Sequence, residues 1–176
     1  MINPEELALV TPDTAWQDSY LRYIEELGDE ERYPFPMDFD HRDFPALLQK
    51  IADFAAGENL PAGYVPSTTL WLVHGAKLLA VVNIRHYLND NLRHAGGHIG
   101  LGVRPSARGQ SLGSYLLGLG VRYARTLGIG DVHVHCYQDN PGSVGMIKRC
   151  GGQLDSEVAL SDTPSPTIVQ RYIIAK

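Results

Sequence analysis

The sequence predicts an α/β protein of the α+β type with a mixed, mostly antiparallel sheet. Three observations predict this class. The expected elements follow the order strand, two helices, three strands, helix, strand, helix and two strands, which is not a regular strand–helix alternation. The 176 residues are 44% hydrophobic and 20% charged, as in globular domains. No repeat or composition shift marks a boundary, so residues 1–176 are expected to form a single domain.

The N-terminal half is expected to form one strand, two helices and a hairpin. Asp13 and Asp43 are suitable N-caps, because a short acidic side chain accepts a hydrogen bond from the first free N–H groups of a helix. The hydrophobic period then changes from helical to alternating, which predicts strands. The expected elements are a strand at 7–10, helices from the two caps to Gly28 and Gly57, and hairpin strands at 69–74 and 78–87. Residues 33–39, 57–67 and 89–97 are expected to be loops.

The C-terminal half alternates strands and helices before a final pair of strands. Pro105 ends one strand, Gly128 ends the following helix, and Asn140 is a suitable N-cap for the last helix. The expected elements are strands at 98–103, 131–137, 153–160 and 168–174, and helices at 109–127 and 141–149.

The turn between the strand ending at Val103 and the next helix predicts an anion site. The first N–H groups of a helix have no internal acceptor, and the helix dipole adds positive charge there. Gly109 and Gly113 leave room for a phosphate to approach the backbone, and Arg108 can add a charge-assisted bond. By themselves, the two glycines are explained equally well if Gly109 is only a turn residue and Gly113 only a packing residue in the helix. Dinucleotide-fingerprint and P-loop lysine patterns are both missing, which favours a diphosphate of another kind.

This segment resembles the acyl-CoA-binding motif of the GNAT superfamily of acetyl-CoA-dependent N-acyltransferases. That motif, Arg/Gln-x-x-Gly-x-Gly/Ala after a strand ending in Val-x-Pro, matches Val103, Pro105, Arg108 and Gly113. Ser111 stands where the superfamily usually has glycine. With its neighbouring segments, the sequence is more closely similar to a bacterial subgroup whose substrate is not established.

A second segment, residues 137–152, resembles the superfamily pattern Asn-x-x-Ala-x-x-x-Tyr-x-x-x-Gly-Phe. Asn140, Ser143 and Gly151 are in register with it, whereas Ile147 and Gly152 replace the tyrosine and the phenylalanine. The tyrosine is the superfamily's usual proton donor. Because isoleucine cannot donate a proton, Ile147→Tyr is expected to be tolerated.

The resemblance implies a GNAT-like fold in which the two central strands, here 98–103 and 131–137, splay apart and are flanked by helices. It also implies acetyl-CoA as co-substrate, with backbone groups near Leu101 and Val103 along the pantetheine arm. The acetyl group would pass to a primary amine on a small molecule. The alternatives are a protein N-terminus or lysine as acceptor, or a catalytically weakened acyl-CoA-binding module. The residues expected to bind acetyl-CoA are Leu101, Val103, Arg108, Gly109, Gln110, Ser111, Leu112, Gly113, Ser114, Asn140 and Ser143.

His98 is the first candidate for the general base, because imidazole titrates near neutral pH and this residue opens a cleft-lining strand. His98 shares one face with Gly100 and Gly102, which predicts an open face for a ligand. The alternative is a histidine hydrogen-bonded at a strand end. His86 is the next candidate base.

Three further residues are candidates for binding the acceptor. Arg85 suits a substrate carboxylate, with a surface ion pair as the alternative. Tyr33 and Phe35 are expected to wall the acceptor pocket or to cover the core. The acidic run 29–31 is either a solvated loop or an attraction for the amine.

Charge and composition exclude several partners. The net charge of −5 disfavours nucleic acid, and no apolar run approaches the roughly 20 residues that span a bilayer. The start of the chain lacks the basic and apolar parts of a signal peptide, so a cytoplasmic location is expected. His133 and His135 share a strand face but lack a third ligand, so no metal is expected. The last two strands and residues 121–127 are the expected surface of a possible homodimer.

Overall fold

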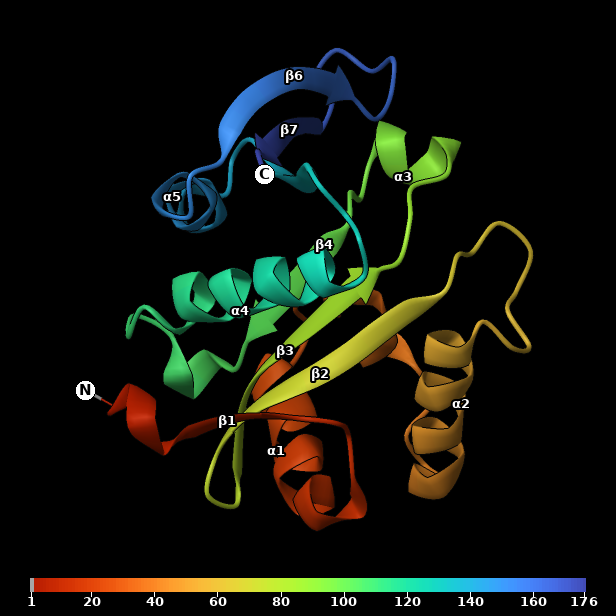
Figure 1. Cartoon of the computed structure of the whole chain (residues 1–176), viewed down its shortest axis with the longest axis vertical. Helices are drawn as coiled ribbons and strands as arrows, with labels where there is room; N and C mark the ends of the chain where they lie inside the picture. The colour runs from red at the N-terminus through yellow and green to blue at the C-terminus, as the bar shows by residue number, and fades with distance from the viewer. Residues whose placement is uncertain (1) are drawn as a thin grey trace.

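The computed structural model describes residues 2–176 and contains two antiparallel sheets (Figure 1). The first sheet has the order β1-β2-β3-β4 and the second has the order β5-β7-β6. The strands are β1 (Leu7–Val10), β2 (Ser67–His74), β3 (Lys77–Arg85), β4 (Ile99–Val103), β5 (Val132–Tyr137), β6 (Gln153–Ala159) and β7 (Ile168–Ile174). The helices are α1 (Gln17–Leu27), α2 (Phe44–Ala56), α3 (Asp90–His94), α4 (Leu112–Thr126) and α5 (Pro141–Arg149). The expected α+β class is confirmed.

The two sheets meet where β4 and β5 begin, and the strands diverge from there. The N–H of His98 donates to the carbonyl oxygen of His133 at 2.7 Å, and an isolated bridge joins Gly97 to Val134. A Cβ atom on Gly97 would lie 2.6 Å from the His133 carbonyl oxygen, so only glycine permits this approach. No ladder joins β4 to β5 beyond it in the described chain, so the expected splay is present.

The first sheet has a core on each face because its strands alternate their side chains. Trp71 and Val73 pack with α1 and α2, whereas Leu72 packs with α4 on the opposite face. In Figure 1, α4 lies on one side of this sheet and α1 on the other. Strand β3 is buried on both faces and accordingly reads as an almost continuous apolar run. This double packing fixes β4 beside α4, which positions the start of that helix at the splay.

Most expected elements are confirmed, and the differences lie in loops. Strands β1 and β7 and helix α5 have the expected bounds. Helix α4 begins at Leu112 and not at residue 109, because Gly109 and Ser111 take positive φ angles of 77° and 61°. Helix α3 lies in a segment expected to be a loop, and its N-cap is Asn89, whose side chain accepts from the N–H of Leu92 at 2.9 Å. Such a short helix leaves little hydrophobic periodicity to read.

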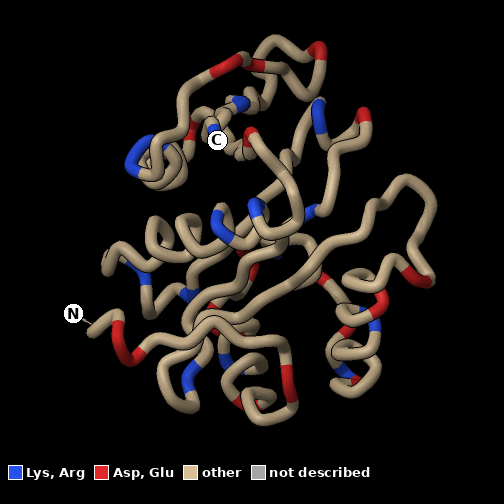
Figure 2. Tube along the Cα trace, viewed as in Figure 1, with Lys and Arg blue, Asp and Glu red and all other residues tan. Residues whose placement is uncertain are grey.

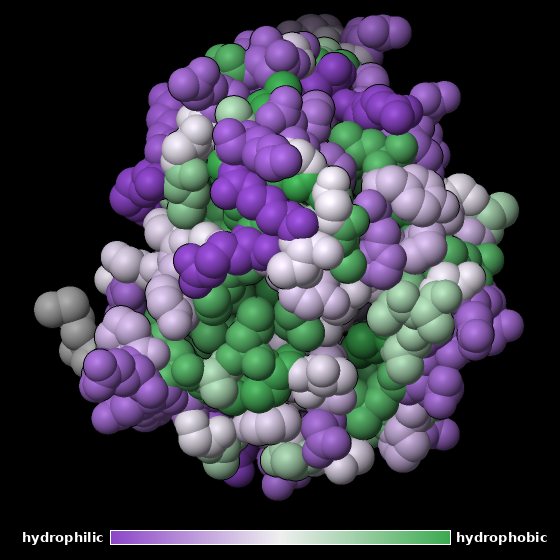
Figure 3. All heavy atoms as spheres, viewed as in Figure 1, coloured by the Kyte–Doolittle hydropathy of each residue, from purple (hydrophilic) through white to green (hydrophobic). Residues whose placement is uncertain are grey.

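Short 3₁₀ helices account for two smaller differences. One spans Thr14–Trp16 before α1, and Asp13 caps it by accepting from the N–H of Ala15 at 2.8 Å. The other spans Phe35–Asp38 in the segment expected to be a loop. No helix within residues 2–176 has the length and apolarity to cross a membrane. The face seen in Figure 3 carries an apolar area near its middle, surrounded by polar atoms.

Candidate active site

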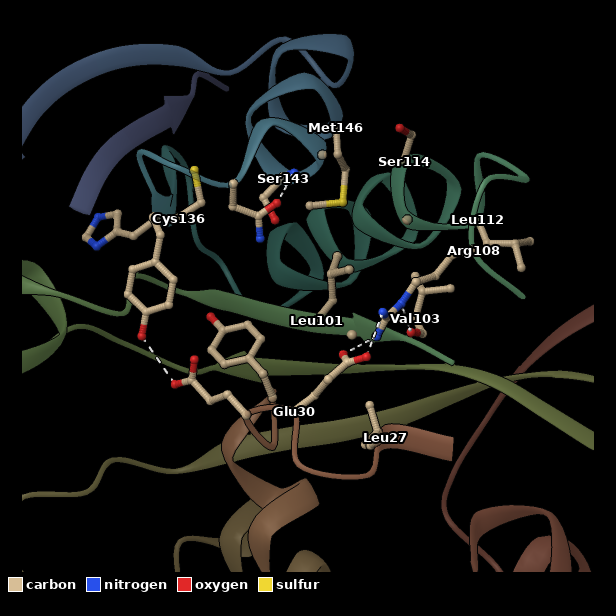
Figure 4. A pocket seen from close by; sticks show the side chains of 18 of the residues that line it. Leu27, Glu30, Leu101, Val103, Arg108, Leu112, Ser114, Cys136, Ser143 and Met146 are labelled. Carbon is tan, nitrogen blue, oxygen red and sulfur yellow. Dashed lines mark hydrogen bonds and ion pairs between the residues drawn. The ribbon is translucent and has the colours of Figure 1, made fainter. Parts of the chain in front are cut away.

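A cavity of about 1080 Å³ lies where β4 and β5 diverge (Figure 4). Its walls come from the end of α1 and the loop after it, from β4 and β5, and from the N-terminal parts of α4 and α5. The cavity therefore joins segments from the whole length of the chain. The cavity forms because β4 and β5 diverge, so that the facing edges of the two strands do not hydrogen-bond to each other.

The start of α4 forms one end of this cavity. Its N-cap is Ser111, whose side chain makes no capping hydrogen bond. The N–H groups of Ser111–Ser114 therefore have no acceptor within the helix and no side-chain cap. Together with the helix dipole they make an anion site that faces the cavity. Residues Gly109, Ser111, Leu112, Gly113 and Ser114 line the cavity as expected, whereas Gln110 does not.

The open edge of β4 presents backbone groups to the same cavity. The N–H of Arg104 donates to the Leu79 carbonyl oxygen on β3 at 2.8 Å. Alternate residues of an antiparallel strand bond to the same neighbour, so Gly102 also bonds to β3. The backbone groups of Leu101 and Val103 then point the other way, toward β5. Both residues line the cavity, as the resemblance implied.

Arg108 lines the cavity but is already paired. Its guanidinium donates to both carboxylate oxygens of Glu30, at 3.1 and 2.7 Å, and its Nε donates to the Val103 carbonyl oxygen at 3.1 Å (Figure 4). The hydrogen bond from Arg108 lowers the pKa of Glu30. Arg108 therefore links the loop after α1 to the end of β4, in addition to the anion role expected from the sequence.

Gly113 packs against a side chain of α5. A Cβ atom there would lie 3.0 Å from the sulfur of Met146 and 3.8 Å from a methyl group of Val103. The missing side chain therefore brings α4 close to α5 as well as leaving the backbone accessible. Lys148 and Arg149 make the far end of α5 basic (Figure 2), and Arg149 lines the cavity.

The opposite end of the cavity is acidic and aromatic. The hydroxyl of Tyr137 donates to a carboxylate oxygen of Glu31 at 3.2 Å, which is one of the dashed lines in Figure 4. Burial, followed by the charge of Glu31, raises the pKa of Tyr137, so its hydroxyl keeps its proton. Tyr33 and His135 also line this end. It can therefore bind a cation and hold a proton.

The comparison with known families agrees with this geometry. The model of the acetyltransferase (GNAT) family matches residues 20–152. The chain belongs to the GNAT family. The resemblance to the GNAT superfamily and the expected acyltransferase class are thereby confirmed. None of the curated proteins matches the sequence.

Solved structures share the GNAT fold at low sequence identity. The ribosomal L7/L12 alpha-N-protein acetyltransferase RimL, in complex with coenzyme A, has a TM-score of 0.71 and 16% identity, over 96% of this chain and 93% of that one. A mutant spermidine N-acetyltransferase SpeG from Vibrio cholerae has a TM-score of 0.67 and 14% identity, over 97% of this chain and 94% of that one. A putative acetyltransferase, yncA from Salmonella typhimurium with acetyl-CoA, has a TM-score of 0.64 and 12% identity, over 97% of this chain and 94% of that one. Neighbours with coenzyme A or acetyl-CoA agree with acetyl-CoA as the co-substrate of a GNAT enzyme.

His98 does not line the cavity of this GNAT protein. Its side chain is 7% exposed, and its Nδ1 accepts a hydrogen bond from the N–H of His133 at 2.9 Å. Burial, helped by His133 and Arg85, lowers the pKa of His98 to about 4. This is the alternative considered from the sequence, a histidine hydrogen-bonded at a strand end.

The expected open glycine face of β4 is a wrong prediction. A Cβ atom on Gly100 would lie 2.9 Å from the hydroxyl of Tyr33, and one on Gly102 would collide with the Tyr33 carbonyl oxygen. The loop after α1 therefore covers this face. The glycines serve that close packing, and the ligand-accessible side of β4 is its backbone edge.

The remaining expected residues divide between the cavity and the neighbouring core. Tyr33, Asn140 and Ser143 line the cavity, but His86, Arg85 and Phe35 do not. His86 shares a hydrogen bond with Thr68 at 2.8 Å, and burial lowers its pKa. The ring of Phe35 packs among Phe39, Phe54 and Tyr64. Arg85 is 6% exposed and makes no ion pair within residues 2–176, so the expected surface ion pair is wrong.

Several cavity residues were not singled out from the sequence. Glu31 was weighed only as part of an acidic run, and Tyr137 only as a strand end. The available signal was the alternation of β5, which puts His133, His135 and Tyr137 on one face. Their rings confirm it for the histidines, with centroids 6.1 Å apart. Among residues 2–176, no group of three or more His, Cys, Asp or Glu side chains is arranged to hold a metal ion.

Proposed function

We propose that this GNAT protein transfers the acetyl group of acetyl-CoA to a primary amine of a small molecule. The observation that carries the proposal is the uncapped N-terminus of α4, which opens into a cavity of about 1080 Å³. The N–H groups of Ser111–Ser114 would hold the pyrophosphate. The backbone groups of Leu101 and the N–H of Val103, which have no partner on β5, would bind the pantetheine arm, and their N–H groups would polarise the thioester carbonyl.

Helix α5 would form the second wall of the co-substrate site. The Oδ1 atom of Asn140 accepts from the N–H of Ser143 at 3.1 Å, so this oxygen is used as the N-cap. The amide NH₂ of Asn140 and the hydroxyl of Ser143 remain as donors beside the cavity. Arg149 donates to the hydroxyl of Ser114 at 3.1 Å, which ties the two helix walls together near the proposed phosphate site.

The acceptor would bind at the acidic end, with its amine beside Glu31 and Tyr137. An amine must be neutral to attack a thioester, so one proton has to leave it. We assign that proton to the Glu31–Tyr137 pair in place of His98 or His86, because the pair lines the cavity and the histidines do not. In this proposal the carboxylate of Glu31 takes the proton, and the hydroxyl of Tyr137, which also lines the cavity, protonates the departing thiolate.

A small acceptor is supported by the several segments that meet at this end of the cavity. Tyr33, Gly96 and His135 line the cavity, and so do Leu160, directly after β6, and Val169 on β7. The alternatives are a protein N-terminus or lysine, and a binding module without turnover. The structural neighbours include both a spermidine N-acetyltransferase and a ribosomal L7/L12 alpha-N-protein acetyltransferase.

A panel of amines with colorimetric detection of released CoA thiol tests the function. The expected result is CoA release above the hydrolysis background with at least one small amine, and less with peptides of free N-terminus or free lysine. Glu31→Gln should lower kcat/KM by roughly 10²–10⁴-fold, the range for a general base, with unchanged acetyl-CoA affinity. Acetyl-CoA binding by calorimetry without any turnover would instead indicate a binding module. Full activity of Glu31→Gln would remove its assigned role.

A further inference from the structure

Two arginines at opposite ends of β4 are about equally buried, but only one has a counter-ion. Arg104, 5% exposed, pairs with Glu26 at 2.7 Å and also donates to Ser19 and Leu78. Arg85, 6% exposed, has one hydrogen-bond acceptor within residues 2–176, the Gly96 carbonyl oxygen at 3.3 Å. The ring of Phe35 lies 5.7 Å from its guanidinium carbon. Burying a charge without a counter-ion is unfavourable in free energy, so Arg85 has the features of a group that binds an anion.

The side chains around Arg85 supply further donors and no carboxylate. The Nδ1 atom of His135 accepts from the N–H of Gly96 at 3.1 Å, which puts the ring proton on Nε2. That Nε2 atom is buried without a partner, and so is Nε of Arg171. Arg171 is the direct cross-strand neighbour of His135 in the β5–β7 ladder. The pKa of His135 is lowered to about 4, mainly by burial and further by the neighbouring groups His133, Arg171, Arg85 and His98. No acidic group is among these causes.

This donor cluster adjoins the acceptor end of the cavity. His135 lines the cavity, and so do Gly96 and Tyr33, which are both next to Arg85. A Cβ atom placed on Gly100 would lie 2.9 Å from the hydroxyl of Tyr33 and 3.3 Å from a guanidinium nitrogen of Arg85, so these two groups are near each other. His135 and Tyr137 share one face of β5 two residues apart, which is about 6.6 Å along the strand. The donor cluster and the Glu31–Tyr137 pair are therefore neighbours.

We propose that Arg85, His135 and Arg171 form a subsite for a carboxylate of the acceptor, so that the acceptor is a zwitterion such as an amino acid. The ammonium end would lie at Glu31 and Tyr137, and the carboxylate end would accept from the Nε2–H of His135 and from the guanidinium groups. The Nε2–H of a neutral imidazole donates to an anion but not to an ammonium ion, which fixes the orientation of the acceptor. This inference rests on the proposed function, and it narrows the amine to one that carries an acid group.

The wild-type enzyme provides the first test and needs no variant. Released CoA is measured with three matched series: free amino acids, their carboxamides and the corresponding amines without the carboxyl group. Removing a charge-assisted bond between buried groups corresponds to about 10- to 100-fold in kcat/KM. We expect the acids to exceed both other series by that factor. Equal kcat/KM across the three series overturns the inference and leaves the proposed function standing.

Arg85→Met tests the residue itself, with Arg93→Met on the exposed surface of α3 as the matched control. We expect Arg85→Met to raise KM about 10- to 100-fold for acids only, while the amines, the acetyl-CoA affinity and the melting temperature change little. Arg93→Met should behave as wild type. An equal loss for acids and amines in Arg85→Met, with the fold intact, also overturns the inference.

Calorimetry separates failure of the inference from failure of the function. Free amino acids are titrated into wild-type and Arg85→Met protein in the presence of CoA. If no amine is acetylated but an amino acid binds and loses affinity in Arg85→Met, the subsite stands and the proposed function falls. If no amino acid binds and none is acetylated, the subsite is refuted.

Discussion

A negative charge introduced at the start of α4 should stabilise that helix but weaken its binding of an anion. Ser114 is the third residue of α4, and Ala46 is the third residue of α2, which lies outside the cavity. Ser114→Glu and Ala46→Glu therefore place the same charge at the same helical position. A carboxylate in a first turn interacts favourably with the helix dipole and stabilises by about 0.3–1 kcal/mol. Both variants should be at least as stable as the wild type.

Only one of the two variants should lose acetyl-CoA. A carboxylate at residue 114 would lie in the same first turn as the N–H groups proposed to bind the phosphate. At an assumed separation of about 5 Å and an effective dielectric constant of about 20, two unit charges repel each other by about 3 kcal/mol, and screening in an open cavity lowers this to about 1.5–3 kcal/mol. The dissociation constant for acetyl-CoA should therefore rise about 10- to 100-fold in Ser114→Glu and stay unchanged in Ala46→Glu.

Calorimetric titration with acetyl-CoA and urea unfolding of both variants check this prediction. Acetyl-pantetheine, which lacks the pyrophosphate, should lose less affinity than acetyl-CoA in Ser114→Glu. The reasoning is refuted if Ser114→Glu binds acetyl-CoA as tightly as the wild type. A parallel loss in Ala46→Glu would mean that net charge, and not the position, controls binding.

Four further results are expected. Ser111→Gly should raise the free energy of unfolding in urea by about 1 kcal/mol, because serine at a φ of 61° is strained where glycine is not; no gain would mean that the loop relaxes elsewhere. Ile147→Tyr, expected from the sequence to be tolerated, should instead cost about 1–3 kcal/mol, since Ile147 is 1% exposed in the core against Gly152; an unchanged melting temperature would contradict this. Burial lowers the pKa values of His98 and His135 to about 4, so the unfolded chain binds more protons than the folded chain between pH 6.5 and 4. The free energy of unfolding in urea should therefore fall by about 1–2 kcal/mol per histidine between pH 7 and pH 5. A free energy of unfolding that does not change with pH would show that the rings stay accessible. The possible homodimer predicts twice the monomer mass in light scattering, with β6 at the free edge of its sheet as the first surface to alter; a monomer mass at high concentration ends that prediction.

The sequence by itself was enough for features that depend on neighbours along the chain. Caps at Asp43 and Asn140 fixed two helix starts, because a side chain and the N–H groups it caps are at most three residues apart. The strand, turn and helix around residues 99–126 likewise follow from local signals, and the anion site follows with them. The resemblance to the GNAT superfamily rests on the same contiguous motif. For this reason most of the residues expected to bind the co-substrate line the cavity.

The proposed acceptor end was decided only by the tertiary structure. Glu31 meets Tyr137, and Glu30 meets Arg108, across 106 and 78 residues of chain. The face of β4 that carries His98 was expected to be open, yet the loop at Tyr33 covers it, which no pattern within β4 can reveal. Which side of a strand meets a ligand depends on the packing of distant segments. The proposed acceptor site therefore depends on contacts between residues that lie far apart in the sequence.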